Sequence, residues 1–460
     1  MAMGKRKPRQ ETLFVATDRL MQSAGHPFYQ KLNALLDEAK FDRWIEGRCE
    51  PYYEQDERRG RPSIVPGVYF RMLLVGYFEG IDSQRGIAWR CADSLSLRQF
   101  LGIALDEGTP DHSTLTIIRQ RLPAEVFEEV FQFVLGIAEA KELIAGKTVG
   151  VDSTTLEANA AMKSIVRKDT GEDWKQFVTR LMREEGAIGA EEQPSDEEIR
   201  QFDKKRKNKK VSNAEWQAPA DEDARIARMK DGTTHLAYKA EHVVDLESEL
   251  VLAAEIRPAD HGDTATLIDS VLAAQINLEK AGSEVVIEEA VADKGYHAAE
   301  QIELSDFMDI RTYIPEPKRA EKAKLADHPE EQRRAVRNNR RRVKRAKSKA
   351  LQRRRSEVVE RSFAHICETG GSRRSHLRGL VNVTKRYLIT VAAHNLGRIL
   401  RRLTGVGKPR GLQGAGGLAA GSFLPVERLK TAFGRAGGRL ATTIARFRTF
   451  KQWDTIAIEI

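Results

Sequence analysis

Residues 147–158 read KTVGVDSTTLEA and decide the fold of the larger part of this chain. Val149 and Val151 alternate with smaller residues, which is the pattern of a strand that buries one face. Asp152 follows directly, and we expect the strand to end there and turn into a loop. The segment therefore predicts a carboxylate at the end of a strand.

Outward from this strand, helix and strand patterns alternate along the chain. Strand patterns occupy 234–248, 250–260, 283–293 and 309–315, and helix patterns occupy 264–282 and 298–307. The first two strands predict a hairpin, Gly282 ends the first helix, and Asp293 ends the third strand. This order predicts an α/β fold with a ribonuclease-H-like mixed sheet that carries helices on its faces.

The N-terminal part, residues 1–143, has a different pattern. Apolar residues recur at three and four positions from about Phe28 onward, which predicts an all-α domain. Within it, Asp111 is placed to cap a helix that carries Arg119 and Arg121. An ordinary capped helix and a helix that reads DNA both fit this segment.

The rest of the chain divides by composition. Residues 144–403 form the predicted core domain, and the densely charged residues 159–232 form an insertion within it. Residues 404–460 are rich in glycine and basic, which predicts a poorly ordered tail.

The chain has a formal net charge of +9, and the excess is concentrated in residues 333–355, which hold thirteen basic residues and no acid. Such a run predicts phosphate contacts with a polyanion, and we assign them first to Arg340, Arg341 and Arg342. The three cysteines have no CxxC spacing, so neither a zinc site nor a disulfide framework is indicated. No apolar run is long enough to span a bilayer, and we expect a cytoplasmic protein.

Three acids in separate contexts indicate the chemistry: Asp152, Asp293 and Glu360. Glu360 lies beside the apolar stripe of a helix that begins in the basic stretch, and Glu357 precedes it by one turn. Two divalent cations about 3.5–4 Å apart can stabilise the attacking and leaving oxygens of a phosphodiester. Mg²⁺ prefers carboxylate and water oxygens, so we expect two Mg²⁺ ions here, or Mn²⁺ in their place.

Other candidate residues have simpler explanations. Residues 260–263 (DHGD) resemble a metal cluster, but Asp263 is expected to cap the following helix. His235 and His242 are expected on a sheet face. Tyr296 is either a DNA contact or a packed aromatic ring.

Taken in order, several of these segments resemble the successive blocks of bacterial insertion-sequence transposases of the DDE type. They are VGVDSTTLEANA, DARIARMKDGTTHLAYKAEHVVD, IRPADHGDTATL, AVADKGYHAAEQI and VVERSF followed by SHLRGL and AAHNLGRIL. GRPSIVPGVYFRMLLVGYFEG and the residues after it resemble the helical domain that precedes the catalytic core in that family. The resemblance covers about residues 60–403.

The resemblance implies that Asp152, Asp293 and Glu360 are the catalytic triad, and it favours Glu360 over Glu357. Many relatives carry a Tyr and an Arg before the Glu and a Lys after it, which assist binding of the DNA end. This chain has Ser at 356 and Cys at 367 instead. The arginines that could take this part are Arg353, Arg355, Arg373 and Arg374.

By the same resemblance, the chain is predicted to be a DNA transposase. It would bind the terminal inverted repeats of its own element through the helical domain, cleave the ends and join them to target DNA. Its partner would be double-stranded DNA, bound by a homodimer in the nucleoid. Two alternatives remain: a stand-alone nuclease with the same core, and a DNA-binding repressor of transposition that has lost catalysis.

Overall fold

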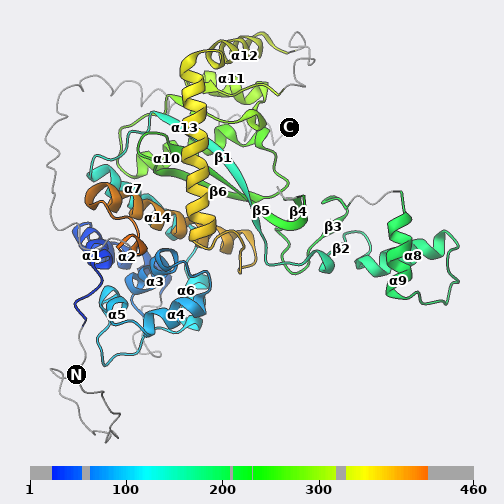
Figure 1. Cartoon of the computed structure of the whole chain (residues 1–460), viewed down its shortest axis with the longest axis horizontal. Helices are drawn as coiled ribbons and strands as arrows, with labels where there is room; N and C mark the ends of the chain where they lie inside the picture. Colours follow the sequence, from blue (N-terminus) through cyan, green and yellow to red (C-terminus); the bar gives the residue numbers. More distant parts are fainter. Residues whose placement is uncertain (1–22, 54–62, 208–210, 230–231, 318–327, 413–460) are drawn as a thin grey trace, which may run out of the picture.

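The computed structural model describes residues 23–53, 63–207, 211–229, 232–317 and 328–412. Figure 1 shows a helical N-terminal region, a core built around one mixed sheet, and an arm that projects from the core. Most of the predicted tail, from residue 413 on, lies outside the described residues.

The N-terminal region is helical, as predicted. Its helices are α1 (Pro27–Glu38), α2 (Phe41–Cys49), η2 (Glu50–Tyr52), α3 (Pro66–Glu79), α4 (Gln84–Ala92), α5 (Leu95–Leu101), α6 (His112–Arg121) and α7 (Ala124–Ala140). Side-chain caps set several of their starts: Ser83 accepts from Gly86 N, and Asp111 accepts from Ser113 N. The cap predicted for Asp111 is therefore confirmed.

The core sheet combines antiparallel and parallel strands. Its members are β1 (Thr148–Glu157), β4 (Arg225–Arg228), β5 (Thr234–Asp245), β6 (Val251–Pro258), β7 (Glu289–Val291) and β8 (Arg311–Tyr313). β5 and β6 form the predicted hairpin, β5 pairs antiparallel with β1, and β7 and β8 continue parallel to β1. An antiparallel meander extended by two parallel strands is the ribonuclease-H-like arrangement that was predicted.

One detail of the strand prediction is wrong: Asp152 is not at the end of its strand. β1 runs on to Glu157, because the residues from 149 to 157 all pair with β5. The threonines that looked like the start of a loop are β-branched and suit a strand. On the other side of β1, however, β7 ends at Val291, so Asp152 lies where its parallel neighbour stops.

Helices cover both faces of the sheet. α13 (Ala346–Phe363) lies on one face, where Ser362 Oγ is 2.8 Å from His242 Nδ1. α10 (Leu267–Lys280) lies on the other, where Ser270 Oγ donates to Glu241. Side chains alternate along a strand, so neighbouring residues of β5 mark the two faces. Gly150 allows α13 to approach closely, since a Cβ there would lie 3.0 Å from Val359 Cγ2.

α14 (Leu380–Thr404) joins the N-terminal region to the sheet. It packs against α3, α7 and β6. Tyr77 OH lies 3.1 Å from His394 Nδ1, and Asn395 bonds both backbone groups of Val251. As a result, a single apolar core extends from the N-terminal helices to the sheet.

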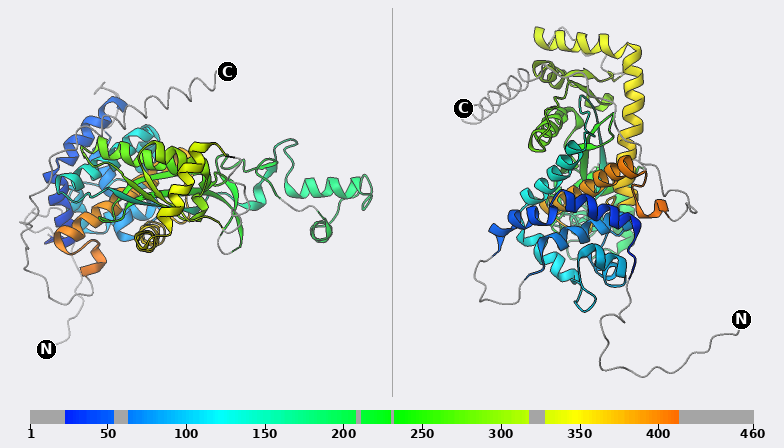
Figure 2. Two further views of the ribbon diagram at one scale, coloured as in Figure 1. Left: turned by 90° about the horizontal axis from the view of Figure 1, so that it is seen from above. Right: turned by 90° about the vertical axis from the view of Figure 1, so that its left-hand side faces the viewer.

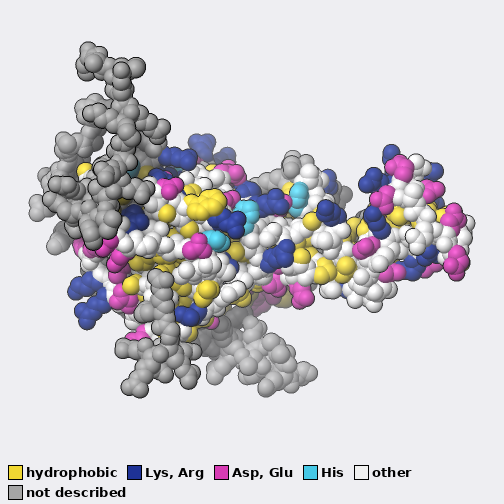
Figure 3. Space-filling model, turned by 90° about the horizontal axis from the view of Figure 1, so that it is seen from below, with side chains coloured by type: hydrophobic (Ala, Val, Ile, Leu, Met, Phe, Trp, Pro, Cys, Tyr) yellow, Lys and Arg dark blue, Asp and Glu magenta, His cyan; other side chains and the backbone are white. Residues whose placement is uncertain are grey.

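Most of the predicted insertion forms the arm. Its last part does not, because β4 pairs with β5 in the core sheet. The arm contains η3 (Met162–Ser164), β2 (Val166–Arg167), α8 (Trp174–Glu184), α9 (Asp196–Lys205) and β3 (Trp216–Gln217). Figure 2 shows the arm extending away from the body, and Figure 3 shows basic and acidic side chains mixed over it. α8 and α9 have a small core of their own, made by Val178, Met182 and Ile199.

The basic stretch is helical and bent. α12 (Glu330–Val343) ends at Lys344, and α13 starts after Arg345, whose backbone is extended. The two helices meet at a sharp corner (Figure 2). The remaining elements are η4 (Asp263–Ala265), η5 (Lys294–Tyr296), α11 (Ala299–Phe307), the π-helical turn η8 (Ala364–Thr369) and η9 (Pro409–Leu412). None of the described helices is both long and apolar enough to cross a membrane.

Candidate active site

Asp152 lies on β1, and Asp293 lies two residues beyond the end of the neighbouring parallel strand β7. In the register of β1 and β7, Gly150 is the partner of Val291. Each aspartate lies two residues beyond this last pair, so both carboxylates belong to the same end of the two strands. Burial is the main cause that raises the pKa of Asp152, and the charge of Asp293 adds a smaller increase, which shows that the two carboxylates are close enough to interact.

The Asp152 carboxylate is held on both oxygens. Oδ1 accepts from Ser153 N at 2.8 Å, and Oδ2 accepts from Arg355 Nη1 at 2.7 Å. Burial raises the pKa of Asp152 and Arg355 lowers it, with a net upward shift. The side chain remains 24% exposed, so it can be reached from solvent.

Asp293 starts the short helix η5. Its Oδ1 accepts from Gly295 N at 2.7 Å, which turns the chain immediately after the strand. A Cβ on Gly295 would lie 2.9 Å from that oxygen and 3.3 Å from Asp263 Oδ2. The DKG sequence therefore permits a tight turn that leaves the carboxylate at the sheet edge.

Glu360 lies on α13, the helix that packs against β1. Residues four apart share one side of a helix, so Gln352, Ser356 and Glu360 form one row. The row begins beside Asp293, because Gln352 Nε2 donates to Ala292 O at 2.9 Å. It ends with Glu360 Oε1, which accepts from Ser356 Oγ at 2.7 Å.

Glu357 lies on a different side of the same helix. Arg361 binds both Glu357 and Glu249, and Arg354 also binds Glu249, with Nη2 2.9 Å from Oε1. Glu249 lies in the turn between β5 and β6, at the end of the sheet away from Asp293. The surroundings of Glu357 are thus those of a structural ion-pair cluster.

The donor set at the edge fits a hard divalent cation, because it consists of carboxylate oxygens with no thiol or imidazole. Within the described residues, no group of three His, Cys, Asp or Glu side chains gathers closely enough to hold a metal ion. Asp152 and Asp293 come together, and Glu360 stands apart, exposed and bound to Ser356. The three cysteines are buried and free.

Asp263 was expected to cap a helix, and this expectation is wrong. Neither η4 nor α10 has a side-chain cap. Instead, Asp263 Oδ1 accepts from Ser153 Oγ at 2.9 Å and pairs with Lys239 Nζ at 2.5 Å. It reaches the edge from the α10 face, opposite to Asp152, and no helical or strand pattern around residue 263 could have placed it there.

Two aromatic or histidine candidates are parts of the core. Tyr296 is buried and donates to Glu241 Oε2 at 2.8 Å, so it is a packed aromatic ring. His242 is buried between Ser362 and Tyr387, and His235 lies on β5 beside Glu157.

Arg119 and Arg121, the two arginines of the possible DNA-reading helix, point in different directions from α6. Arg119 enters a cavity between the N-terminal region and the core. Arg121 is exposed and its guanidinium lies 4.6 Å from the centre of the Tyr53 ring. The helical period explains the difference, since residues two apart lie on nearly opposite sides.

About half of the basic side chains in the stretch form ion pairs or hydrogen bonds with other residues of the chain. The composition of the stretch did not predict this. Arg340 pairs with Glu316, and Arg342 Nε donates to Thr312 O at 3.0 Å. The basic residues of the stretch that are exposed and have no partner in the described chain are Arg334, Arg341, Lys344, Arg345, Lys349 and Arg353.

Of the other predicted arginines, two contact the side chains or backbone of β1, one lies beside the end of that strand, and one lies on α13. Arg355 is nearly buried against Asp152, and Arg373 Nη1 donates to Thr154 Oγ1 at 3.1 Å. Arg374 is 58% exposed at the end of β1. Arg353 is exposed on α13.

Comparisons with known proteins agree with this arrangement. Residues 16–121 match the family described as a transposase domain, and residues 173–396 match the family described as a transposase DDE domain. The chain belongs to the DDE transposases of insertion sequences. The two matches cover most of the transposase, and the second includes Asp293 and Glu360 but begins after Asp152. The comparisons found no match among curated proteins and none among solved structures.

Family membership gives the general activity of this transposase. It is an enzyme of the transposase and nuclease type that acts on DNA, and its family depends on a divalent metal ion, typically Mg²⁺. The first match contains the helices from α1 to α6, and the second contains the strands of the core sheet except β1.

Proposed function

We propose that this transposase binds the terminal inverted repeats of its own insertion sequence, cleaves the DNA at the ends and transfers the strands to target DNA. The observation that supports the proposal is the parallel pairing of β1 with β7, since Asp152 and Asp293 each lie two residues beyond its last pair and their charges interact. The helix α13, which carries Glu360, is tied to the same part of the sheet through Gln352 and Arg355.

In this proposal Asp152, Asp293 and Glu360 hold two Mg²⁺ ions. When bound, such ions stabilise the attacking and leaving oxygens of the phosphodiester and lower the pKa of an attacking water. Other residues of the chain orient these carboxylates and balance their charge. Arg355 keeps Asp152 ionised and oriented, and Glu360 must release Ser356 to turn toward the edge.

The remaining exposed cations would hold the DNA. Six side chains of the basic stretch face solvent without partners among the described residues, and their charge suits the phosphate backbone rather than particular bases. A homodimer on paired ends, located in the nucleoid, would be the working assembly.

The test uses a duplex that carries the end of the element and a matched duplex with that end scrambled. Purified protein with Mg²⁺ should cleave the first at the end and join its 3′-hydroxyl to a second duplex, and EDTA should abolish both steps. Cleavage without joining would indicate a stand-alone nuclease. Specific binding without cleavage would indicate a repressor.

A further inference from the structure

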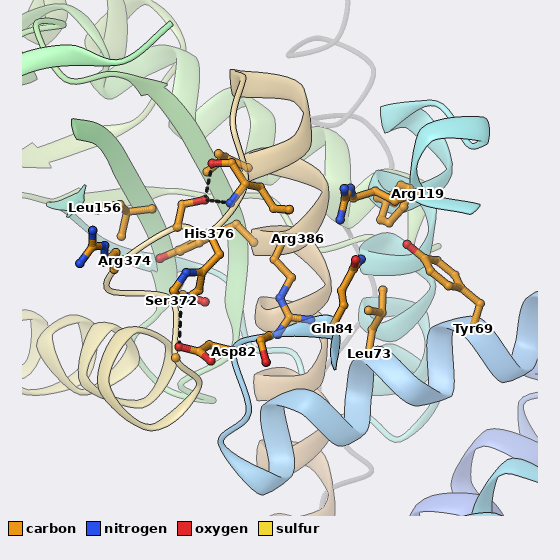
Figure 4. A pocket seen from close by; sticks show the side chains of 17 residues that line it. Tyr69, Leu73, Asp82, Gln84, Arg119, Leu156, Ser372, Arg374, His376 and Arg386 are labelled. Carbon is orange, nitrogen blue, oxygen red and sulfur yellow. Dashed lines mark hydrogen bonds and ion pairs between the residues drawn. The ribbon is translucent and has the colours of Figure 1, made fainter. Parts of the chain in front are cut away.

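A cavity of about 200 Å³ lies at the junction of the N-terminal region and the core (Figure 4). α3, α6 and the start of α4 line one side, and α14 with residues 371–377 lines the other. Residues 371–377 close onto the end of β1, because Ser375 N donates to Glu157 O at 2.8 Å. We call this cavity the junction pocket.

Two arginines enter the junction pocket from opposite sides. Nε and Nη1 of Arg119 are buried and have no hydrogen-bond partner among the described residues. Arg386 reaches in from α14 and donates to Ile81 O at 3.2 Å. Burial lowers the pKa of both side chains, as expected where cations are removed from water without compensation.

The acidic side chains that line the pocket do not neutralise the charges of Arg119 and Arg386. Asp82 is the one carboxylate among the described residues that line the pocket, and its Oδ2 already lies 3.0 Å from His376 Nε2. Lys385 adds a further cation next to Arg119, because its Nζ bonds the Arg119 carbonyl at 3.1 Å. Arg374, 58% exposed, adds positive charge to the pocket lining.

Burying two guanidinium nitrogens without hydrogen-bond partners destabilises the folded protein, unless a ligand supplies the hydrogen-bond acceptors. Guanidinium groups match the geometry of phosphate oxygens and bind them through paired hydrogen bonds. The hydroxyls of Tyr69 and Ser372, which also line the pocket, are further donors. The chemistry of the pocket is therefore that of a site for one phosphate group.

We propose that the junction pocket binds a phosphate group through Arg119 and Arg386, and that this phosphate belongs to the backbone of the DNA held at the sheet edge. The second part rests on the proposed function. β1 connects the two places: Asp152 lies at the edge and Leu156 lines the pocket. Four residues of a strand span about 13 Å, so the pocket would hold a phosphate that flanks the one at the edge.

The first arm of the test measures phosphate binding without DNA. Inorganic phosphate at about 10 mM should raise the unfolding temperature of the wild-type protein and not that of the R119Q/R386Q variant, because only a ligand of the folded state stabilises it. R90Q is the matched control, since Arg90 pairs with Glu79 and does not line the pocket. Without phosphate, R119Q should be at least as stable as the wild type, because it removes a buried charge that lacks partners. An equal rise in the wild type and in R119Q/R386Q would overturn the site.

The second arm identifies the source of the phosphate. In R119Q/R386Q, the slope of log affinity for duplex DNA against log salt should flatten by about 0.9, the value for one phosphate that is no longer neutralised, and R119K/R386K should restore it. An unchanged slope together with phosphate protection in the first arm would overturn the DNA assignment and leave free phosphate as the ligand. Cleavage of the end duplex by wild-type protein with Mg²⁺, measured in parallel, tests the proposed function separately from the pocket.

Discussion

Arg355 Nη1 lies 2.7 Å from Asp152 Oδ2, so the helix that carries Glu360 is tied directly to the strand that carries the first aspartate. The Arg355 side chain is 10% exposed and that of Asp152 is 24% exposed. A pair this sheltered is screened less than a surface ion pair. The contact both orients Asp152 and fixes α13 over the sheet.

Replacing Arg355 with Gln should therefore destabilise the fold. Removing one partner leaves the Asp152 carboxylate partly buried without a cation, and we expect a loss of about 1–3 kcal/mol in the free energy of unfolding. Urea unfolding of R355Q, D152N and the double variant measures this. The double variant should lose less than the sum of the two single losses, and strict additivity would contradict a direct pair.

The three acids should be required for cleavage but not for folding. Asp152→Asn, Asp293→Asn and Glu360→Gln should each abolish Mg²⁺-dependent cleavage while DNA affinity stays within a few fold, because each change removes one ligand charge. Glu357→Gln is the matched control, since Glu357 lies in the Glu249 cluster. It should retain substantial activity. An inactive E357Q variant beside an active E360Q variant would assign the third ligand to Glu357.

Much of the fold was predictable because it depends on local patterns. The alternation in β1, the hairpin β5–β6 and the helix that ends near Gly282 each follow from a periodicity within one segment. The extent of β1 was not predictable in this way. Its last residues are extended because they pair with β5, from which they are separated by the whole insertion.

The site was predictable to a smaller degree. Asp152 and Asp293 were singled out because each follows a run of alternating apolar residues, and their roles in the site stay a prediction. Asp263 was missed as a neighbour, since its partners Ser153 and Lys239 lie on other strands and no spacing reveals them. The basic stretch was treated as one surface, whereas contacts with the sheet bury some of its members.

Stability should depend on pH through His242. Burial lowers its pKa to about 3, while an unfolded histidine titrates near 6.5. The unfolded state therefore binds more protons between these values, and stability is lost as the pH falls below about 6.5. Each such histidine contributes a slope of up to about 1.4 kcal/mol per pH unit. Urea unfolding between about pH 6 and pH 5 gives the slope of the unfolding free energy against pH, and this slope should be flatter in H242Q than in the wild type by about 1 kcal/mol per pH unit. Equal slopes in the two proteins would show that folding does not lower the pKa of His242.

The exposed and the bound arginines of the basic stretch should behave differently. Replacing Arg334, Arg341 and Arg345 with Gln should weaken binding to end-containing and random duplexes alike. It should flatten the salt slope by up to about 0.9 for each phosphate that these side chains neutralise. Arg342→Gln is the matched comparison. Because Arg342 bonds Thr312, it should lower stability and leave the slope unchanged.

Recognition of the DNA ends should lie on the exposed side of α6, and the full chain is needed to test it. A fragment that ends near Leu143 would lose α14, which covers α3 and α7, so it should fold poorly and bind without preference.

In the full chain, Gln120 and Arg121 are exposed on α6, while Arg119 faces the junction pocket. Q120A/R121A should reduce the preference for the element's own ends over scrambled DNA by at least about tenfold, because contacts to base edges are worth about 1–3 kcal/mol each. R119Q should weaken binding to the end-containing duplex and to the scrambled duplex equally, because a phosphate contact carries no sequence information. If Q120A/R121A retains the full preference in competition binding, recognition of the ends belongs to the core or the arm.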